Sequence, residues 1–267
     1  MPYTTASDGA RLHWETHGSG DPVLLIMGLG SNAYGWHRAI PWLAERYETI
    51  AFDNRGTGRS DAPAGEYTIA QMAADTATVL DAAGHRRAHV IGASLGGMIA
   101  QRFALTYPER VRTLTLLCTT PGGRAAVHAS DAVTAGLVSG GGDPAAVYRK
   151  NAWFLYGEET RTRFPERIEE DIVYRTKIPT SPAGYLGQLR AAVGHDTWDE
   201  LAALAAVPTL VVHGDADLLI PTDNGKRLAE RIPNAQLVLL PGAGHMLQAD
   251  AGDTVRETVL SFLGRAA

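Results

Sequence analysis

Residues 90–97 read Val90-Ile91-Gly92-Ala93-Ser94-Leu95-Gly96-Gly97. The apolar residues before Gly92 predict the end of a buried strand, and the residues from Leu95 onward predict a helix. The pattern Gly-x-Ser-x-Gly between them is typical of a sharp turn that lifts a serine hydroxyl clear of a sheet. Glycines at 92 and 96 would let neighbouring backbone pass where a Cβ would collide. Ser94 is therefore a candidate nucleophile, and the Leu95 amide at a helix N-terminus would favour developing negative charge beside it.

Short apolar runs alternate with helical spacing on both sides of this turn. Strands are expected at 23–27, 49–52, 88–91, 111–117, 209–212 and 236–240, and helices at 36–46, 68–83, 95–106, 224–231 and 254–263. The first 17 residues predict a hairpin whose turn is Ser7-Asp8-Gly9-Ala10. Because buried strands alternate with helices, we predict an α/β fold with a mostly parallel central sheet and flanking helices.

The stretch from 122 to 206 interrupts this alternation. It shows no clear buried strand, is rich in helix formers and aromatic residues, and contains the glycine-rich run 139–143, which we expect to be flexible. A long insertion outside the sheet is usually a functional lid. We therefore expect residues 1–121 and 207–267 to form the core and residues 122–206 to form a helical cap over it.

Composition narrows the class of protein. The 267 residues include 45% apolar residues and one cysteine, and the formal net charge is −5. Cys118 alone cannot form an internal disulfide and fits a reducing cytoplasm. Without a basic block, a nucleic-acid partner is not expected, and without an apolar run of roughly 20 residues neither is a membrane span. The first residues also lack the basic-then-apolar order of a signal peptide. We expect a soluble cytoplasmic protein, and the sequence does not indicate its oligomeric state.

Signals for cofactors and metals are weak. Gly28-x-Gly30 and Gly56-x-Gly58 follow strands but lack the third glycine of a dinucleotide fingerprint, and no phosphate-binding Gly-Lys-Ser/Thr loop is present. His213, Asp215 and Asp217 lie near one another, yet no helical His-Glu-x-x-His or cysteine pair supports a metal site. We expect neither a cofactor nor a metal.

A serine nucleophile needs a base and an acid that orients the base. For this kind of turn, the acid and then the histidine follow the serine along the chain. His213-Gly214-Asp215-Ala216-Asp217 follows one predicted strand, and Gly242-Ala243-Gly244-His245 follows the next. Both loops belong to the sheet edge where open α/β folds place their sites. His245 is the candidate base, and Asp215 and Asp217 compete as the acid.

At this point the chain resembles the α/β-hydrolase fold superfamily. Its pattern Gly-x-x-Asp-x-x-x-Pro matches Gly214, Asp217 and Pro221, which implies that Asp217 is the acid. Two further stretches match, at 52–60 and 240–245. The resemblance implies that Asp53 and Arg55 order a loop beside the site.

The resemblance also implies a second oxyanion donor in the loop after the strand 23–27. That loop reads Met27-Gly28-Leu29-Gly30-Ser31, so the N–H of Leu29 would act together with the N–H of Leu95. Relatives commonly have His-Gly where this chain has Met-Gly. For the pocket wall, which a small-molecule site needs, the aromatic candidates are Trp36, Trp153, Phe154 and Tyr156.

Short stretches of this chain resemble two particular groups within the superfamily. Ile26-Met27-Gly28 resembles aclacinomycin methylesterase and its relatives, and the turn with Gly97-Met98-Ile99-Ala100-Gln101 resembles 3-oxoadipate enol-lactonases. With the candidate triad, the superfamily resemblance implies a serine esterase or lactonase that cleaves a small-molecule ester or lactone through an acyl-enzyme, and the excess of arginine over lysine indicates a bacterial source. Two alternatives stay open: a carbon–carbon bond hydrolase or cofactor-free perhydrolase with the same triad, and a ligand-sensing receptor that retains the triad.

Overall fold

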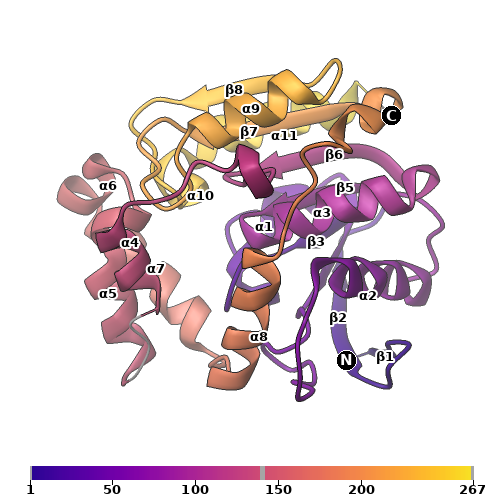
Figure 1. Cartoon of the computed structure of the whole chain (residues 1–267), viewed down its shortest axis with the longest axis horizontal. Helices are drawn as coiled ribbons and strands as arrows, with labels where there is room; N and C mark the ends of the chain where they lie inside the picture. Colours follow the sequence, from indigo (N-terminus) through magenta and orange to yellow (C-terminus); the bar gives the residue numbers. More distant parts are fainter. Residues whose placement is uncertain (1, 139–141, 266–267) are drawn as a thin grey trace.

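The fold is built around one β-sheet. The computed structural model describes residues 2–138 and 142–265 of the chain. The sheet has eight strands in the order β1-β2-β4-β3-β5-β6-β7-β8 (Figure 1). β1 pairs antiparallel with β2, β2 pairs antiparallel with β4, and every other neighbouring pair is parallel. The strands are β1 Tyr3–Thr5, β2 Arg11–His17, β3 Asp21–Ile26, β4 Tyr47–Phe52, β5 Ala88–Ala93, β6 Val111–Leu117, β7 Thr209–Gly214 and β8 Gln236–Leu240. The expected hairpin and mostly parallel sheet are confirmed.

The helices fall into a core set and a set between β6 and β7. The core set is α1 Ile40–Leu43, α2 Ile69–Ala82, α3 Leu95–Thr106, α9 Asp223–Arg231, α10 Leu247–Asp250 and α11 Gly252–Gly264. The second set is α4 Asp131–Val138, α5 Pro144–Leu155, α6 Glu158–Arg163, α7 Pro165–Thr176 and α8 Pro182–Val193. Short 3-10 helices are η1 Ala33–Trp36, η2 Pro108–Arg110, η3 Gly123–Ala125 and η4 Leu201–Ala206. No helix in the described part of the chain is long and apolar enough to cross a membrane.

Both faces of the sheet are covered, as the side chains of β3 show. Leu24 and Ile26 pack in a cluster with residues of α2 and α3, whereas Val23 and Leu25 pack in another with residues of η1, α1 and α11. Successive strand residues point to opposite faces, so a strand buried on both faces is apolar throughout. Burying each such aliphatic side chain contributes about 1.5–3 kcal/mol. The short apolar runs of the sequence thus become the middle layer of the molecule.

The helix expected over residues 36–46 is wrong. η1 ends at Trp36, and α1 covers only one turn from Ile40 to Leu43. Pro41 has no backbone N–H and occupies the first turn of α1, the part of a helix that tolerates proline. The apolar spacing is therefore divided between two short helices.

Between β6 and β7 the described residues form helices and no strand. In Figure 1, α4–α7 form a group at the left, and α8 lies between this group and the core. An apolar cluster in this group includes Phe154 and Ile172 and extends to Ala249 of α10. The segment begins and ends at one place, because Gly122 pairs with Asp196, and Leu201 and Leu204 of η4 pack in the core cluster with α3. Of the glycine-rich run that we expect to be flexible, residues 139–141 lie outside the described residues.

α8 approaches the core closely at two glycines. A Cβ at Gly184 would collide with the carbonyl oxygen of Gly56, and the backbone of Gly187 lies against the Tyr67 ring. Glycine permits this approach because it has no side chain. The last helix of the segment is thus fixed against the loop that follows β4.

Candidate active site

Ser94 lies on the turn between β5 and α3. Its backbone has φ 56° and ψ −121°, a conformation that costs free energy for a residue with a Cβ. A Cβ at Gly92 would collide with the backbone of Gly96, and one at Gly96 with the carbonyl of Ile26. The turn is held by the N–H of Ser94, which donates to Leu117 O at 2.9 Å. The expected close packing of backbone around this serine is therefore present.

Asp217 and His245 come together from the loops after β7 and β8. The Nδ1 of His245 lies 2.8 Å from Asp217 Oδ2, and both side chains are buried. The other carboxylate oxygen accepts the N–H groups of Leu219 and Ile220, each at 2.9 Å. Asp215 instead accepts the N–H of Gly242 at 2.7 Å and is exposed. The geometry thus pairs the histidine with Asp217.

The environment of Asp217 favours its ionised form. Burial alone would raise the pKa of this carboxyl, but His245 and His213 together lower the pKa to about 2. His213 lies on β7, and its Nε2 is 3.5 Å from Asp217 Oδ2. In the sequence, this histidine stands out only as a possible metal ligand. An ionised Asp217 makes Nδ1 of His245 the protonated nitrogen, which leaves Nε2 available as a base. Ser94 and His245 line the same cavity.

The two residues expected to supply oxyanion donors, Leu29 and Leu95, both line this cavity. Leu95 is the first residue of α3, where backbone N–H groups have no acceptor within the helix. The loop of Leu29 has three side-chain contacts: Asn54 donates to Met27 O at 2.9 Å, Gln188 Oε1 accepts the N–H of Gly30 at 2.9 Å, and Thr180 donates to Gly30 O at 2.8 Å.

Sequence reasoning did not find these contacts. Gln188 and Thr180 come from the segment between β6 and β7, about 150 residues away along the chain. Gln188 is fully buried, and its amide nitrogen also donates to Arg55 O at 2.9 Å. The same segment touches the loop of His245, because the N–H of Met246 donates to Leu155 O at 2.9 Å. Both loops of the candidate site are therefore tied to this segment.

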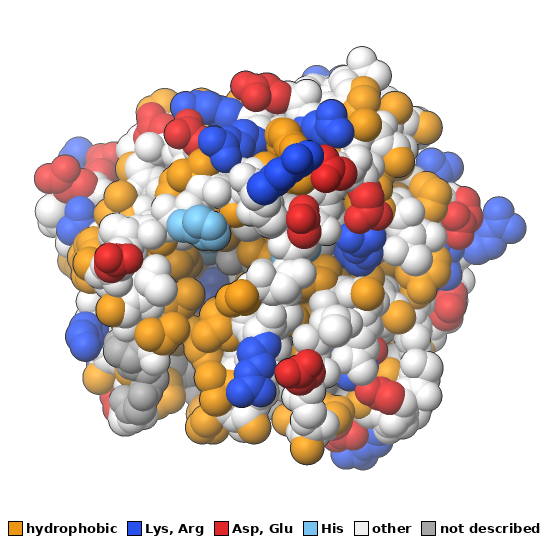
Figure 2. Space-filling model, in the orientation of Figure 1, with side chains coloured by type: hydrophobic (Ala, Val, Ile, Leu, Met, Phe, Trp, Pro, Cys, Tyr) orange, Lys and Arg blue, Asp and Glu red, His pale blue; other side chains and the backbone are white. Residues whose placement is uncertain are grey.

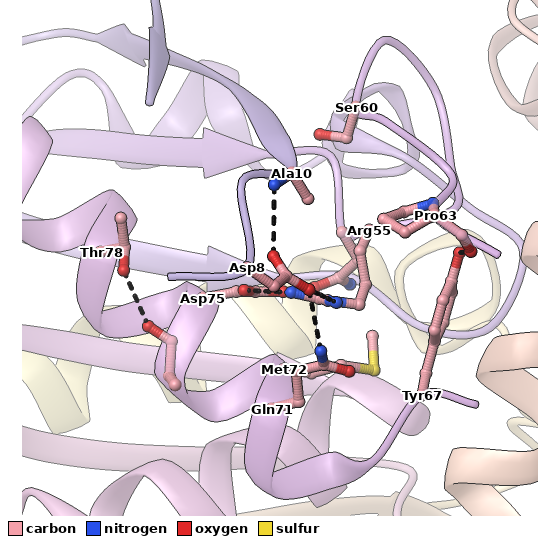
Figure 3. A network of polar contacts seen from close by, with 12 residues as sticks. Asp8, Ala10, Arg55, Ser60, Pro63, Tyr67, Gln71, Met72, Asp75 and Thr78 are labelled. Atoms are coloured by element: carbon pink, nitrogen blue, oxygen red, sulfur yellow. Dashed lines mark hydrogen bonds and ion pairs between the residues drawn. The ribbon is translucent and has the colours of Figure 1, made fainter. Parts of the chain in front are cut away.

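Arg55 anchors the loop that follows β4, where it forms ion pairs with Asp75 and Asp8. Figure 3 shows its guanidinium between Asp75 on α2 and Asp8 in the hairpin turn, with Nη2 2.7 Å from Asp75 and Nη1 2.8 Å from Asp8. Burial alone would lower the pKa of Arg55, but the contacts with Asp75 and Asp8 outweigh burial and raise the pKa. Asp53 is also buried and accepts the N–H of Ala33 at 2.8 Å. Both side chains hold loops and do not line the cavity.

The cavity beside Ser94 has a volume of about 850 Å³, within the usual range for small-molecule sites. Its wall is mainly apolar and includes Leu29, Trp36, Met98, Phe154, Leu219 and Ile220. Val138 and Leu186 belong to the wall and are also exposed, at 55% and 51%. On the face shown in Figure 2, hydrophobic side chains gather over the region of α8, at the lower left.

Two of the four aromatic candidates for the pocket wall lie elsewhere. Trp36 and Phe154 line the cavity, but Trp153 is 43% exposed and outside its lining. Successive helical residues point about 100° apart, so Trp153 and Phe154 face different sides of α5. Tyr156 is buried beneath the wall, where its hydroxyl donates to Asp171 at 3.1 Å. The expectation that the aromatic cluster as a whole lines the pocket needs this correction.

Side chains that could bind a metal ion are not grouped together in the described part of the chain. No group of three His, Cys, Asp or Glu side chains is placed to hold a metal ion there. Cys118 is buried, and burial raises the pKa of its thiol, so the reactive thiolate is disfavoured.

Comparison with known proteins identifies the family. The model of the alpha/beta hydrolase fold family matches residues 21–251. The chain belongs to the α/β-hydrolase fold family. A protein of Azorhizobium caulinodans named "Putative carbamate hydrolase RutD" is 34% identical over 99% of this chain and 98% of its own. A poly(3-hydroxyalkanoate) depolymerase of Ectopseudomonas oleovorans is 35% identical over 91% of this chain and 84% of its own.

A solved structure agrees with these matches. A thermophilic esterase from Thermogutta terrifontis superposes with a TM-score of 0.84 and 27% identity, covering 99% of this chain and 98% of that one. The predicted fold class and family are thus confirmed, and the relatives support a hydrolase of the α/β-hydrolase class.

Proposed function

We propose that this α/β-hydrolase is a serine hydrolase that cleaves a carboxylic ester or lactone of a small molecule. The observation that carries the proposal is the 2.8 Å contact between His245 and Asp217, beside a cavity that Ser94 and His245 both line. An ordered base, a turn serine beside it and a mainly apolar cavity are what acyl transfer to a serine requires.

In the proposed reaction, Ser94 Oγ attacks the carbonyl carbon while Nε2 of His245 accepts the hydroxyl proton. Asp217 stabilises the resulting imidazolium and keeps Nδ1 protonated. The N–H groups of Leu29 and Leu95 donate to the oxyanion of the tetrahedral intermediate. The imidazolium then protonates the leaving alkoxide, and an alcohol departs.

The acyl-enzyme is hydrolysed by the same groups. His245 removes a proton from a water molecule, whose oxygen attacks the acyl carbon. Collapse of the second intermediate returns the proton to Ser94 and releases the carboxylic acid. The net reaction consumes one ester and one water and needs no cofactor.

Replacement of the serine tests this proposal. We expect Ser94→Ala to lower the turnover of p-nitrophenyl acetate by about 10⁴ or more, with unchanged circular dichroism, whereas Ser261→Ala on exposed α11 keeps wild-type turnover. A Ser94→Ala variant within tenfold of wild type would reject the nucleophile. Negligible turnover by the wild type of every ester in a broad panel would favour the ligand-sensing receptor.

Carbamate hydrolysis is a second candidate, because a relative named for that activity aligns over nearly the whole of both chains. The same nucleophile and oxyanion donors serve attack on a carbamate carbonyl. Matched pairs that share an alcohol, one an ester and one a carbamate, separate the two: the higher kcat/KM identifies the better substrate class.

The proposed partner is this small-molecule substrate alone, without nucleic acid or membrane, and the proposed location is the cytoplasm. The net charge of −5 and the single cysteine support these assignments.

A further inference from the structure

The cavity contains a cation that the proposed mechanism does not use. Arg175 lies in the last turn of α7 and lines the same cavity as Ser94 and His245. Burial opposes its charge, but Tyr148, Tyr156 and Asp171 together raise the pKa of the guanidinium, so it stays protonated. Burial raises the pKa of the Cys118 thiol, and the charge of Arg175 acts in the opposite direction and lowers it by a smaller amount. Arg175 is therefore within electrostatic range of the strand end next to Ser94.

The hydrogen-bonding capacity of Arg175 is not fully used. Its Nε is buried and has no hydrogen-bond partner among the described residues. Tyr148 forms a side-chain hydrogen bond with the guanidinium, whose carbon lies 5.9 Å from the centroid of the Tyr148 ring. A buried polar group without a partner is uncommon in proteins and calls for an explanation, such as a ligand.

The nearby carboxylate of Asp171 attracts Arg175 through its charge, but its hydrogen bonds among the described residues go to other groups. Asp171 Oδ1 accepts from Arg38 Nε at 2.7 Å and lies 3.2 Å from His37 Nε2, and Oδ2 accepts from the Tyr156 hydroxyl. Arg38 in turn also contacts Glu170 at 2.7 Å. Asp171 thus interacts electrostatically with both Arg38 and Arg175 but accepts a hydrogen bond from Arg38, and the Arg175 guanidinium lines a mainly apolar cavity with its Nε unpaired among the described residues. Keeping a buried charge in such a place is costly unless an opposite charge joins it.

We propose that Arg175 binds a free carboxylate on the substrate, so that the ester or lactone cleaved at Ser94 is one that carries a second, unesterified carboxyl group. This inference rests on the proposed function and names its substrate class. A guanidinium can donate two parallel hydrogen bonds to a carboxylate, and in an apolar cavity that contact is strong and selective. The cavity volume of about 850 Å³ holds both the reacting ester and such a group.

Matched ester pairs test the proposal. One set compares monomethyl esters of the C4–C8 dicarboxylic acids with methyl esters of fatty acids of equal length. A second set, with the charge on the alcohol side, compares acetyl esters of ω-hydroxy acids with acetyl esters of alcohols of equal length. In one of these sets, the wild type is expected to show at least tenfold higher kcat/KM for the carboxylate-bearing member. Arg175→Met is expected to remove this preference, and Arg175→Lys to restore part of it.

A matched arginine in the same segment is the control. Arg163 is exposed and pairs with Glu159 on α6, outside the cavity lining, so Arg163→Met should keep the wild-type preference. Equal proportional losses of both ester classes in Arg175→Met, or no carboxylate preference in the wild type, would overturn the inference.

A binding measurement separates this inference from the proposed function. Calorimetric titration of Ser94→Ala with adipate and with hexanoate should show tighter binding of the dicarboxylate, which is lost when Arg175→Met is added. If that selectivity is found but no ester is cleaved by the wild type, the anion site stands and the proposed function fails. If esters are cleaved through Ser94 without the selectivity, the reverse holds.

Discussion

At the scale of single residues, the carboxylate of Asp217 is held by more than its histidine. One oxygen accepts two backbone N–H groups, and the other lies against His245. The two backbone contacts fix the plane of the carboxylate, so the imidazole is oriented before a substrate arrives. Such preorganisation is what a general base needs in order to act at the moment of attack.

Exchange of each aspartate for asparagine tests this arrangement. Asp217→Asn is expected to lower kcat by about 10⁴, because an amide in this position holds the imidazole in the wrong tautomer, as in the serine-protease precedent. Asp215→Asn, in the same loop, should keep kcat within about threefold, since the Asp215 side chain is exposed and accepts the N–H of Gly242. Steady-state ester hydrolysis measures the kcat of both variants. A larger loss of kcat in Asp215→Asn than in Asp217→Asn would show that Asp217 is not the acid of the triad.

The sequence allows part of this site to be predicted. The loop positions of Ser94, Asp217 and His245 follow from motifs next to recognisable strands. Gln188 and Arg175 carry no such local signal. Gln188 contacts Gly30, far away in the chain, and Arg175 lines a cavity that exists only once the chain is folded. A glutamine or arginine on a helix is ordinarily a solvated side chain, and only the packing of α7 and α8 on the core gives these two their contacts.

At the scale of elements, the two faces of α5 differ in what they meet. Phe154 is 1% exposed and lines the cavity, whereas Trp153 is on the outer side of the helix. We expect Phe154→Leu to change the ratio of kcat/KM for bulky and small acyl groups by about tenfold, which is about 1.4 kcal/mol of differential transition-state binding. Trp153→Leu should leave that ratio unchanged. A panel of p-nitrophenyl esters of increasing acyl length measures this ratio. If Phe154→Leu and Trp153→Leu changed the ratio equally, Phe154 would not form the wall of the acyl pocket.

α8 is expected to act on catalysis through Gln188. Gln188→Met removes the acceptor for the N–H of Gly30 and so loosens the loop that carries Leu29. We expect kcat to fall by about tenfold to a hundredfold with little change in KM, less than the loss of a whole oxyanion donor. Gln188→Glu keeps an acceptor oxygen and should recover part of kcat.

The control for this variant is Gln236→Met on β8, which removes an exposed contact to Arg265 and should change neither constant. A Gln188→Met enzyme that loses stability yet retains wild-type kcat would show that the contact is structural only.

Among the elements, strands were easier to predict than the short helices. The strands of the sheet centre are buried on both faces, so their apolar runs stand out from the loops. Residues 36–46 instead contain apolar residues that pack on the sheet from two separate short helices, and Pro41 ends any longer one. Helical spacing alone does not distinguish these cases, because the packing partner sets which residues are buried.

At the scale of the whole molecule, two buried histidines couple stability to pH. Burial lowers the pKa of His89 and of His195 to about 4, below the usual 6.5. Both are neutral in the folded protein, so unfolding takes up protons once the pH is below about 6.5. Their contribution is complete above pH 6.5 and is lost as the pH falls toward 4, with a slope of up to about 1.4 kcal/mol per pH unit for each histidine.

Urea unfolding between pH 7 and pH 4.5 measures this dependence. We expect His89→Gln to make the free energy of unfolding less dependent on pH over that range, even if the variant is less stable at pH 7. His17→Gln, at a half-exposed position, is the comparison. An unchanged pH dependence in His89→Gln would show that the buried imidazole does not bind the proton on unfolding.

Because α8 packs closely against the core, it limits which segments of this chain can be exchanged for those of a relative. Any residue larger than glycine at 184 would strike the Gly56 carbonyl, and the same helix supplies the support of the Gly30 loop. A donor segment that replaced α8 would therefore bring foreign contacts to the reacting centre itself. Exchange of residues 126–178 transfers the cavity wall of α5 and α7 and leaves α8 and its contact with the Gly30 loop native. The donor backbone must then supply the carbonyl that Leu155 offers to the N–H of Met246. Chimeras with that junction should acquire a new substrate range while they retain the turnover machinery of this chain.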